Sequence, residues 1–454
     1  MEAQALMQKI LRVENMNQVI LNKVQGELVI RAEELEQTLR DPARRDSLPF
    51  KEVLSLLEYP ALLESADAER LFPKDAIARA KSILHDIPGG LGAYSNSRGE
   101  RTVREHVAEF ISERDGFACD MEDVFLTDGA SAGVVKILQC LIRDEKDGIL
   151  IPIPQYPLYS ATIPMLGGTQ LKYYLDEEKG WSLNIAELES IVEQALAKGV
   201  TPRAMVVINP GNPTGQCLDT ANMQQVIEFC HRRRVLLMAD EVYQANSYIR
   251  PFTSFKKVLR SMGEAYAGFE LVSFHSVSKG VIGECGHRGG YMELVGLDIA
   301  VKQQIYKLAS ISLCPNIAGQ VVVDLMVRPP KPGDDSHDQF QRETQATFES
   351  LKKRAGLLAT ALNQLEGVTC NPAEGAMYLF PRIRLPQRAI DEAKRLCRAP
   401  DVFYCFALLD ATGFGQRDGT FHFRTTFLPQ EEQIRSVVAA MAAFHARFMD
   451  QWRE

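Results

Sequence analysis

The sequence has no long apolar segment, and none of its apolar runs approaches the roughly 20 residues needed to cross a bilayer. Its first residues, MEAQALMQKILRVENMNQ, carry acidic side chains and lack the apolar centre of a secretory signal. These absences argue against a membrane or secreted protein and predict a cytoplasmic one. The amphipathic stretch QALMQKILRV leaves a mitochondrial location as the alternative, because a trimmed organelle presequence has the same character.

Paired cysteines, metal-ligand spacings and an excess of positive charge are missing as well. The nine cysteines form no Cys-x-x-Cys pair and the eight histidines form no His-Glu-x-x-His motif, so neither a disulfide framework nor a metal site is expected. The net charge of −8 gives no reason to expect nucleic acid or an anionic membrane as a partner. What remains is an ordinary globular composition, with 46% hydrophobic and 24% charged residues.

The middle of the chain alternates short apolar runs with helical patterns. The runs predicted as strands are residues 123–127, 148–154, 203–210, 234–240 and 269–275. Because these runs are apolar almost throughout and most are followed by a helical pattern, they predict a mostly parallel sheet that is covered on both faces. The predicted fold class is therefore α/β.

The predicted domain organisation combines both ends of the chain. A chain of 454 residues is too long for one simple core. Residues 327–337, which are rich in Pro, Gly and Asp, mark a boundary. We predict a large α/β domain over residues 76–328 and a smaller α/β domain made of residues 1–75 and 338–454.

Residues that directly follow the predicted strands are candidate site residues, because ligands of open α/β sheets gather at the carboxyl ends of the strands. After residues 123–127, Gly129, Ala130 and Ser131 precede a helix whose first N–H groups would suit a phosphate. An ordinary tight turn capped by Ser131 explains the same residues. Tyr156 follows the second strand, where it either stacks on a planar ligand or packs at the rim of the core.

The next two strands end in an amide and a carboxylate. Asn212 lies in NPGNPTG (209–215), where either Asn–Pro bond could be cis and hold the amide rigidly; a turn without a ligand is the alternative. Asp240 ends an apolar strand, where a carboxylate is costly unless it is paired. A pyridinium nitrogen would be a suitable partner, with Tyr243 beside it, and a helix cap is the alternative.

The last predicted strand leads into SVSKGVIGECGHRGG (276–290). Lys279 places a primary amine, a potential nucleophile, at the strand end, and Ser276 and Arg288 are placed to bind an anion. Alone, this stretch is also explained by a solvated loop with two cations. Together, the strand ends supply a phosphate site, a ring stacker, an amide, a phenol, a carboxylate and an amine. One ligand accounts for that whole set: pyridoxal 5′-phosphate.

Several stretches of the sequence resemble the class I/II aminotransferases of the fold type I pyridoxal-phosphate family, over nearly the whole chain. The stretches are LGAYSNSRG, FLTDGAS, PIPQYPLYSA, VINPGNPTGQ, ADEVYQ, SVSKG, GECGHRGGY, CNPAEGAMYLFP and FGQRDGTFHFR. Within the family the resemblance is strongest to the alanine aminotransferases. It implies the fold type I architecture and a pyridoxal 5′-phosphate cofactor.

The resemblance implies a role for each candidate residue. Lys279 would attach covalently to the cofactor and transfer the α-proton of the substrate. Asp240 would pair with the ring nitrogen. Tyr243 and Asn212 would bond the ring oxygen, and Tyr156 would stack on the ring. The residues that would hold the phosphate are Ala130, Ser131, Ser276 and Arg288.

Two further residues are implied to serve the substrate and a second subunit. Arg424 would bind the α-carboxylate of the substrate. Tyr94 would reach the phosphate bound by the neighbouring subunit, so the active unit would be a homodimer. The implied substrates are small amino acids and 2-oxo acids: the amino group of L-alanine would pass to 2-oxoglutarate by ping-pong chemistry, giving pyruvate and L-glutamate.

Three alternatives to this reaction remain, and two departures from the family bear on them. The alternatives are a glutamate–glyoxylate aminotransferase, a more remote lyase, and a catalytically impaired relative that acts as a binding protein. The family's Ile-Gly-Asn-Pro run does not follow SLPF (47–50), and LLDATG (408–413) meets FGQRDG (414–419) without the family's intervening strand. True deletions there would impair closure over the substrate but not cofactor binding; omission of disordered segments from the sequence would leave both intact.

Overall fold

A seven-stranded sheet forms the centre of the computed structural model, which describes residues 50–408, 416, 417 and 419–453. Its strands are β1 (Val124–Thr127), β2 (Asp147–Ile153), β3 (Thr169–Tyr174), β4 (Thr201–Ile208), β5 (Leu236–Asp240), β6 (Leu271–Ser276) and β7 (Gly290–Val295). They lie in the order β1-β7-β6-β5-β4-β2-β3, and within this sheet only β7 runs antiparallel to its neighbours. The predicted α/β fold with a mostly parallel sheet is confirmed.

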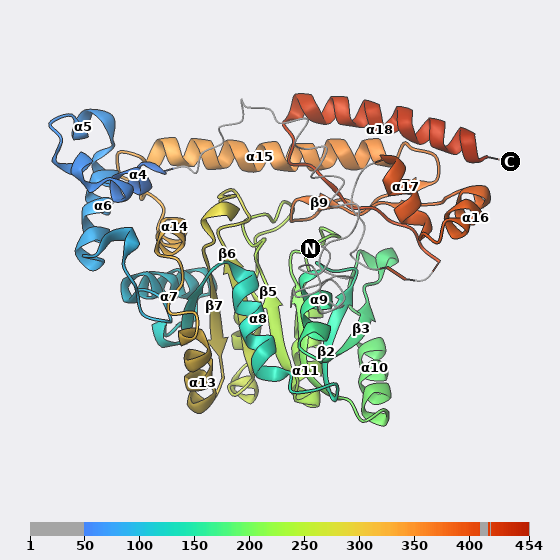
Figure 1. Cartoon of the computed structure of the whole chain (residues 1–454), viewed down its shortest axis with the longest axis horizontal. Helices are drawn as coiled ribbons and strands as arrows, with labels where there is room; N and C mark the ends of the chain where they lie inside the picture. Colours follow the sequence, from blue (N-terminus) through green and yellow to red (C-terminus); the bar gives the residue numbers. More distant parts are fainter. Residues whose placement is uncertain (1–49, 409–415, 418, 454) are drawn as a thin grey trace, which may run out of the picture.

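Helices cover both faces of this sheet (Figure 1). The helices on one face are α8 (Ala130–Leu141), α9 (Leu158–Met165) and α13 (Ile299–Ser310); those on the other face are α10 (Ile185–Ala197), α11 (Thr220–Arg233) and α12 (Phe255–Ser261). Successive residues of a strand enter alternate cores: in β4, Met205 packs with the second group of helices and Val206 with the first. Both faces are buried, which is why the central strands are apolar throughout.

A third core lies at the β1 edge of the sheet. It is formed by α4 (Glu52–Glu58), α6 (Lys74–Asp86), α7 (Arg101–Asp115) and α14 (Ile317–Val327).

Short elements lie in the connections throughout the described chain: η2 (Pro60–Glu64), α5 (Ala68–Leu71), η3 (Gly90–Gly92), η4 (Met121–Asp123), η5 (Glu177–Lys179), η6 (Glu264–Tyr266) and η7 (Cys285–His287). No helix in the described part of the chain is long and apolar enough to cross a membrane.

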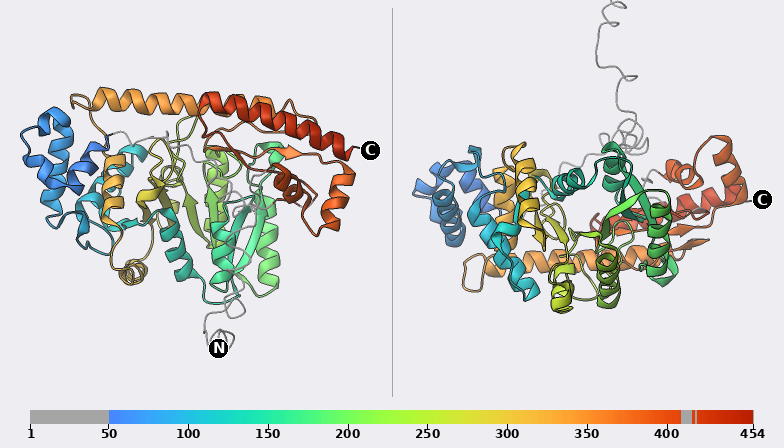
Figure 2. Two further views of the ribbon diagram at one scale, coloured as in Figure 1. Left: turned by 45° about the horizontal axis from the view of Figure 1, so that its top comes forward. Right: turned by 90° about the horizontal axis from the view of Figure 1, so that it is seen from below.

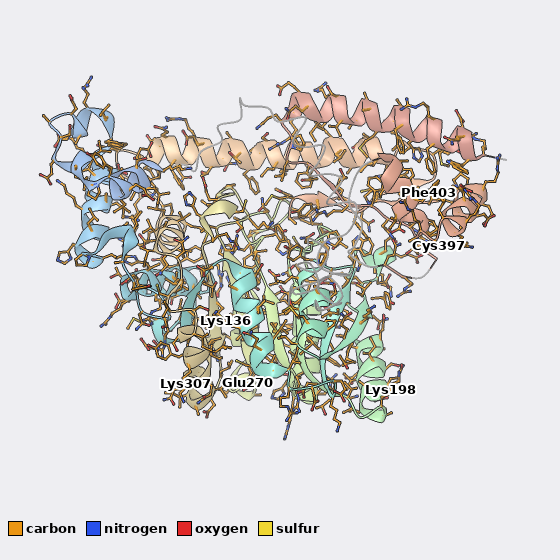
Figure 3. All side chains as sticks on the ribbon, in the orientation of Figure 1. Lys136, Lys198, Glu270, Lys307, Cys397 and Phe403 are labelled. Atoms are coloured by element: carbon orange, nitrogen blue, oxygen red, sulfur yellow. The ribbon has the colours of Figure 1, made fainter. Side chains whose placement is uncertain are left out.

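The C-terminal segment has a core of its own. Its helices are α15 (His337–Leu362), α16 (Gln387–Arg395), α17 (Pro400–Leu408) and α18 (Glu431–Trp452), and its two small sheets pair β8 (Val368–Thr369) with β10 (Arg382–Ile383) and β9 (Tyr378–Leu379) with β11 (Thr425–Thr426). The core also contains Val242 and Tyr243, which follow β5. The C-terminal segment therefore covers the carboxyl ends of the parallel strands. Lys198, at the end of α10, lies at the other end of these strands, near the start of β4 (Figure 3).

The three-part domain division stays a prediction. Residues 1–49 lie outside the described residues, and residues 50–75 lie with α6 at the opposite end of the molecule from α16 and α18 (Figures 1 and 2). The predicted boundary, residues 327–337, falls between α14 and α15. Of the two departures from the family, residues 47–49 and 409–415 are also outside the described residues.

Candidate active site

Nine of the predicted site residues line one cavity of about 230 Å³ at the carboxyl ends of the parallel strands. The predicted residues that line it are Ala130, Ser131, Tyr156, Asn212, Asp240, Tyr243, Ser276, Lys279 and Arg288. They follow five different strands, and the parallel arrangement brings these strand ends to one edge. Polar groups that are far apart in the sequence therefore meet in one place.

Asp240 presents one free carboxylate oxygen in this cavity. The residue ends β5 and has an exposed fraction of only 6%. Its Oδ2 accepts a hydrogen bond of 2.8 Å from the hydroxyl of Tyr159, while Oδ1 has no partner among the described residues. Burial raises the pKa of Asp240, and the Tyr159 hydrogen bond, the backbone N–H of Val242 and the nearby Lys279 charge act against that rise. A buried carboxylate oxygen without a partner requires a donor or a cation, so the cavity suits a ligand with a protonated nitrogen at this point.

An amide, a phenol and an amine lie around the same cavity. The Asn212 side chain donates a hydrogen bond of 3.1 Å to the hydroxyl of Tyr243, and both side chains are buried. Burial raises the pKa of Tyr243, so its hydroxyl stays protonated. The Nζ atom of Lys279 lies 5.7 Å from the centre of the Tyr243 ring. The two Asn–Pro bonds considered in the sequence, Asn209–Pro210 and Asn212–Pro213, are both cis.

One end of the cavity is suited to an anion. Ala130 and Ser131 form the first turn of α8, and no side chain caps that turn. Unpaired N–H groups at a helix start attract phosphate. Gly129 precedes the turn at φ 78°, and a Cβ atom there would come within 2.5 Å of the Arg288 guanidinium. Glycine thus lets Arg288 reach the helix start.

Arg288 and Ser276 are held in place by the loop after β6. The Arg288 guanidinium donates to the carbonyl oxygens of Cys285 and Asp128 at 2.8 and 3.1 Å. The Ser276 hydroxyl accepts a hydrogen bond of 2.9 Å from the N–H of Ser278. These bonds leave donors of both side chains for a ligand. A guanidinium, hydroxyls and a helix start therefore converge on one anion site.

Two predicted residues do not line the cavity. Tyr94 is 80% exposed, in the loop before α7. Arg424 lies just before β11, and its guanidinium carbon is 4.3 Å from the ring centre of Tyr378. The Tyr378 ring packs edge-on against Tyr243 at 6.1 Å. Arg424 thus approaches the cavity from the C-terminal segment, and the strand expected around it is short, with only Thr425–Thr426 in β11.

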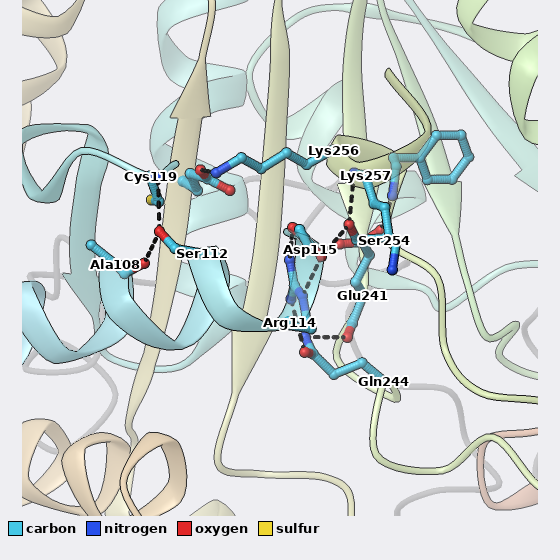
Figure 4. A network of polar contacts seen from close by, with 12 residues as sticks. Ala108, Ser112, Arg114, Asp115, Cys119, Glu241, Gln244, Ser254, Lys256 and Lys257 are labelled. Atoms are coloured by element: carbon cyan, nitrogen blue, oxygen red, sulfur yellow. Dashed lines mark hydrogen bonds and ion pairs between the residues drawn. The ribbon is translucent and has the colours of Figure 1, made fainter. Parts of the chain in front are cut away.

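A buried charged network lies beside the turn after β5 (Figure 4). Arg114 donates two hydrogen bonds, of 2.8 and 2.7 Å, to Asp115 and one of 2.9 Å to Gln244. Glu241 accepts a hydrogen bond of 2.8 Å from the N–H of Phe255, and burial raises its pKa to about 8. These bonds join the turn to α7 and α12. The turn that carries the cavity's phenol is therefore fixed from two sides.

Sequence reasoning missed Tyr159, which holds the central carboxylate. It stands in PQYPLYSA, three residues after Tyr156, in the first turn of the helix that follows β2. This position beside a strand end was the one available signal. Tyrosine is common in apolar cores, and only the packing of α9 on the sheet shows that its hydroxyl meets Asp240.

The family pattern described as Aminotransferase class I and II matches residues 64–441. The chain belongs to the class I and II aminotransferases. Among named relatives of this aminotransferase, the probable mitochondrial alanine aminotransferase of Dictyostelium discoideum is 53% identical, over 98% of this chain and 90% of that protein. Glutamate–glyoxylate aminotransferase 1 of Arabidopsis thaliana is 51% identical over 94% of each chain. Alanine aminotransferase 1 of Homo sapiens is 46% identical over 97% of this chain and 95% of the human protein.

Solved structures share the fold of this aminotransferase. The alanine aminotransferase from Pyrococcus furiosus superposes with a TM-score of 0.73 at 22% identity, covering 95% of this chain and 100% of that one. The Thermus thermophilus aspartate aminotransferase with maleate gives 0.68 at 16% identity, covering 94% and 99%. At these identities the likeness shows the fold, which is fold type I.

The relatives also carry residues that this aminotransferase lacks. The alignment with the Dictyostelium protein spans 483 positions, whereas the chain has 454 residues. Some positions of that relative therefore have no counterpart here.

Proposed function

We propose that this aminotransferase transfers the amino group of L-alanine to 2-oxoglutarate with pyridoxal 5′-phosphate as cofactor, giving pyruvate and L-glutamate. The observation that carries the proposal is the convergence of Lys279, the free oxygen of Asp240 and the anion site on one cavity. Relatives named alanine aminotransferase, at 53% and 46% identity, support the choice of donor.

The residues present fit each part of the cofactor. The free Oδ1 of Asp240 matches a protonated ring nitrogen, and the Asn212–Tyr243 pair matches the ring oxygen. The start of α8, with Arg288, matches the phosphate. Tyr156, which is 41% exposed, would cover one face of the ring. When bound, pyridoxal 5′-phosphate supplies a ring that accepts electrons from the bonds of the substrate's α-carbon.

The remaining chemistry falls to side chains of this chain. The Lys279 amine would bind the cofactor covalently and, once displaced by the substrate amine, remove the α-proton as a general base. Asp240 would keep the ring nitrogen protonated, because an ionised carboxylate stabilises that charge. Arg424 would bind the α-carboxylate with two parallel hydrogen bonds. Alanine and 2-oxoglutarate both carry this carboxylate, so one arginine would serve both half-reactions.

A comparison of two substrate pairs tests the proposal. The second candidate, glutamate with glyoxylate, is favoured by the Arabidopsis relatives at 51% and 49% identity. We expect kcat/KM to be higher for alanine with 2-oxoglutarate; the reverse ranking would select the second candidate. A protein that transfers no amino group from either donor, and whose cofactor absorption does not change when alanine is added, would be a binding protein.

Arg424→Lys is expected to lower kcat/KM for alanine and for 2-oxoglutarate by at least roughly tenfold, since one charged hydrogen bond contributes about 1.5–3 kcal/mol. A lysine cannot reproduce the two parallel bonds of a guanidinium. Steady-state kinetics with each substrate measures the effect, and cofactor absorption should stay normal. Arg382→Lys is the control, because Arg382 in β10 pairs with Glu177 at 3.8 Å. If Arg424→Lys and Arg382→Lys have the same kcat/KM for both substrates, Arg424 does not bind the α-carboxylate.

We also propose that the active unit is a homodimer. Large apolar side chains are exposed beside the anion site: Tyr94 (80%), Ile311 (77%) and Leu313 (58%). The Ser97 hydroxyl donates to the carbonyl of Leu313 at 2.6 Å, so the two loops lie side by side. The N–H of Asn316 donates to Asp128, next to the start of α8, at 2.8 Å. An exposed apolar patch at this place is typical of an interface.

Tyr94→Phe is expected to weaken cofactor retention, because the lost hydroxyl would serve the phosphate in the partner's cavity. Dialysis of the loaded protein, followed by absorption, measures the loss. Tyr59→Phe is the control, since Tyr59 is also exposed, at 64%. In mixed dimers of a Tyr94→Phe chain and a Lys279→Ala chain, one site is free of both changes and should be active. Unchanged retention in Tyr94→Phe would contradict this placement.

The location of the protein stays a prediction. We propose the cytoplasm, with the mitochondrion as the alternative that the names of the Dictyostelium and Arabidopsis relatives favour. Cell fractionation with an antibody to the protein decides between them.

A further inference from the structure

Tyr159 is a deeply buried polar neighbour of the candidate site. Its side chain is fully buried in the core between α9 and the sheet, where Ile151, Ile208 and Met238 also lie. A phenol in an apolar core needs an acceptor for its O–H group. The acceptor is Oδ2 of Asp240, at 2.8 Å. The core between α9 and the sheet therefore directs this phenol at the carboxylate of the site.

This hydrogen bond gives the two carboxylate oxygens of Asp240 different roles. The backbone of Asp240 is already fixed, because its carbonyl accepts a hydrogen bond of 3.0 Å from the N–H of Asn209. The side chain could still rotate about its Cα–Cβ and Cβ–Cγ bonds. The bond to Tyr159 holds Oδ2 against α9 and leaves Oδ1 as the oxygen available to the cavity that Asp240 lines.

We propose that Tyr159 is a positioning residue that keeps Asp240 ionised and aimed at the ring nitrogen of the cofactor. The inference rests on the proposed function, because it requires the cofactor to bind in this cavity. Tyr159 touches neither substrate nor cofactor in this scheme. It acts through Asp240 alone.

The groups that face Asp240 give the expected dependence on pH. They are Tyr159 from α9, Lys279 from the loop after β6 and Tyr243 from the turn after β5. Burial raises the pKa of Tyr159 well above its usual range, so its donor does not titrate near neutral pH. Without this donor, the N–H of Val242 and the charge of Lys279 still oppose burial, but the pKa of Asp240 rises further. As the pH falls, a larger fraction of Asp240 is then protonated and cannot pair with a ring N–H.

The test compares Tyr159→Phe with Tyr173→Phe in cofactor titrations of the unloaded protein. Tyr173 is also buried, and its hydroxyl donates to the carbonyl of Val206 at 2.7 Å, so both variants lose one buried phenol bond. We expect Tyr159→Phe to raise the Kd of pyridoxal 5′-phosphate about tenfold at neutral pH, with a larger factor at lower pH. Tyr173→Phe should keep the Kd of the unmodified protein while its Tm falls.

A double-mutant cycle separates positioning from core packing. In the Asp240→Asn background, Tyr159→Phe should have little further effect on Kd, because the two residues act as one unit. Additive effects, or a Tyr159→Phe Kd equal to that of the unmodified protein at every pH, would overturn the inference and leave the proposed function standing. Failure of the unmodified protein to bind the cofactor would instead overturn the proposed function and this inference with it.

Discussion

Lys279→Ala should lower the turnover of alanine with 2-oxoglutarate by at least roughly 10⁴-fold, while the protein still binds pyridoxal 5′-phosphate. General acid–base catalysis alone contributes about 10²–10⁴-fold, and this variant loses the covalent attachment as well. The start of α8 and Arg288 remain to hold the phosphate. Pyruvate formation measures turnover, and equilibrium dialysis measures the retained cofactor.

Lys198→Ala is the matched control for this change. Lys198 is exposed and lies near the amino end of β4, whereas the cavity lies at the carboxyl ends of the strands (Figure 3). Its loss should leave both turnover and cofactor binding unchanged. If Lys279→Ala keeps full activity, Lys279 belongs to a solvated loop and the assignment of the cavity fails. If it loses the cofactor entirely, the anion site contributes less than the geometry indicates.

Asp240→Asn should slow the half-reaction with alanine by roughly 10²–10³-fold, the range found when one electrostatic group of an active site is removed. An amide is nearly the size of the carboxylate but carries no charge, so it cannot keep the ring nitrogen protonated. The oxygen of the new amide would still accept a hydrogen bond from Tyr159, and the fold should persist. Single-turnover kinetics, followed by the visible absorption of the cofactor, gives the rate.

Asp147→Asn provides the same chemical change at the amino end of a strand, away from the cavity. Asp147 starts β2, is fully buried, and accepts hydrogen bonds from Arg143 and Arg203. The bond from Arg143 holds the pKa of Asp147 well below its usual range. Its replacement should lower the Tm but not the single-turnover rate. An Asp240→Asn variant with an unchanged rate would mean that Asp240 only stabilises the fold.

In the seven-stranded sheet, the strands that are apolar on both faces were predictable from the sequence. Two strands that contain charged residues, β3 and β7, were not predicted. β3 lies at the sheet edge and exposes Lys172, which breaks the apolar run. β7 contains Glu293, and an acidic residue argues against a central strand. In the structure the buried Lys256 of α12 pairs with Glu293, so the charge is compensated by a residue from another element. No local pattern contains that information.

The sequence by itself determined which groups stand at the strand ends, because an apolar run that stops at Asp240 or Ser276 places the next polar side chain at the edge of the sheet. It also limited the chemistry, through the kinds of group that follow each run. Only the tertiary structure decided which groups touch. The strand order places β5 between β4 and β6, and it thereby brings Asp240 within reach of Lys279.

Two contacts show why folding had to decide the rest. Tyr159 meets Asp240 across 81 residues of sequence, because α9 packs its first turn on the end of β5. Arg424 reaches the cavity region only because the C-terminal segment lays Tyr378 against Tyr243. The sequence gives the chemical type of each side chain. Its partner depends on how whole helices and sheets pack, because burial of apolar surface outweighs local conformational preferences.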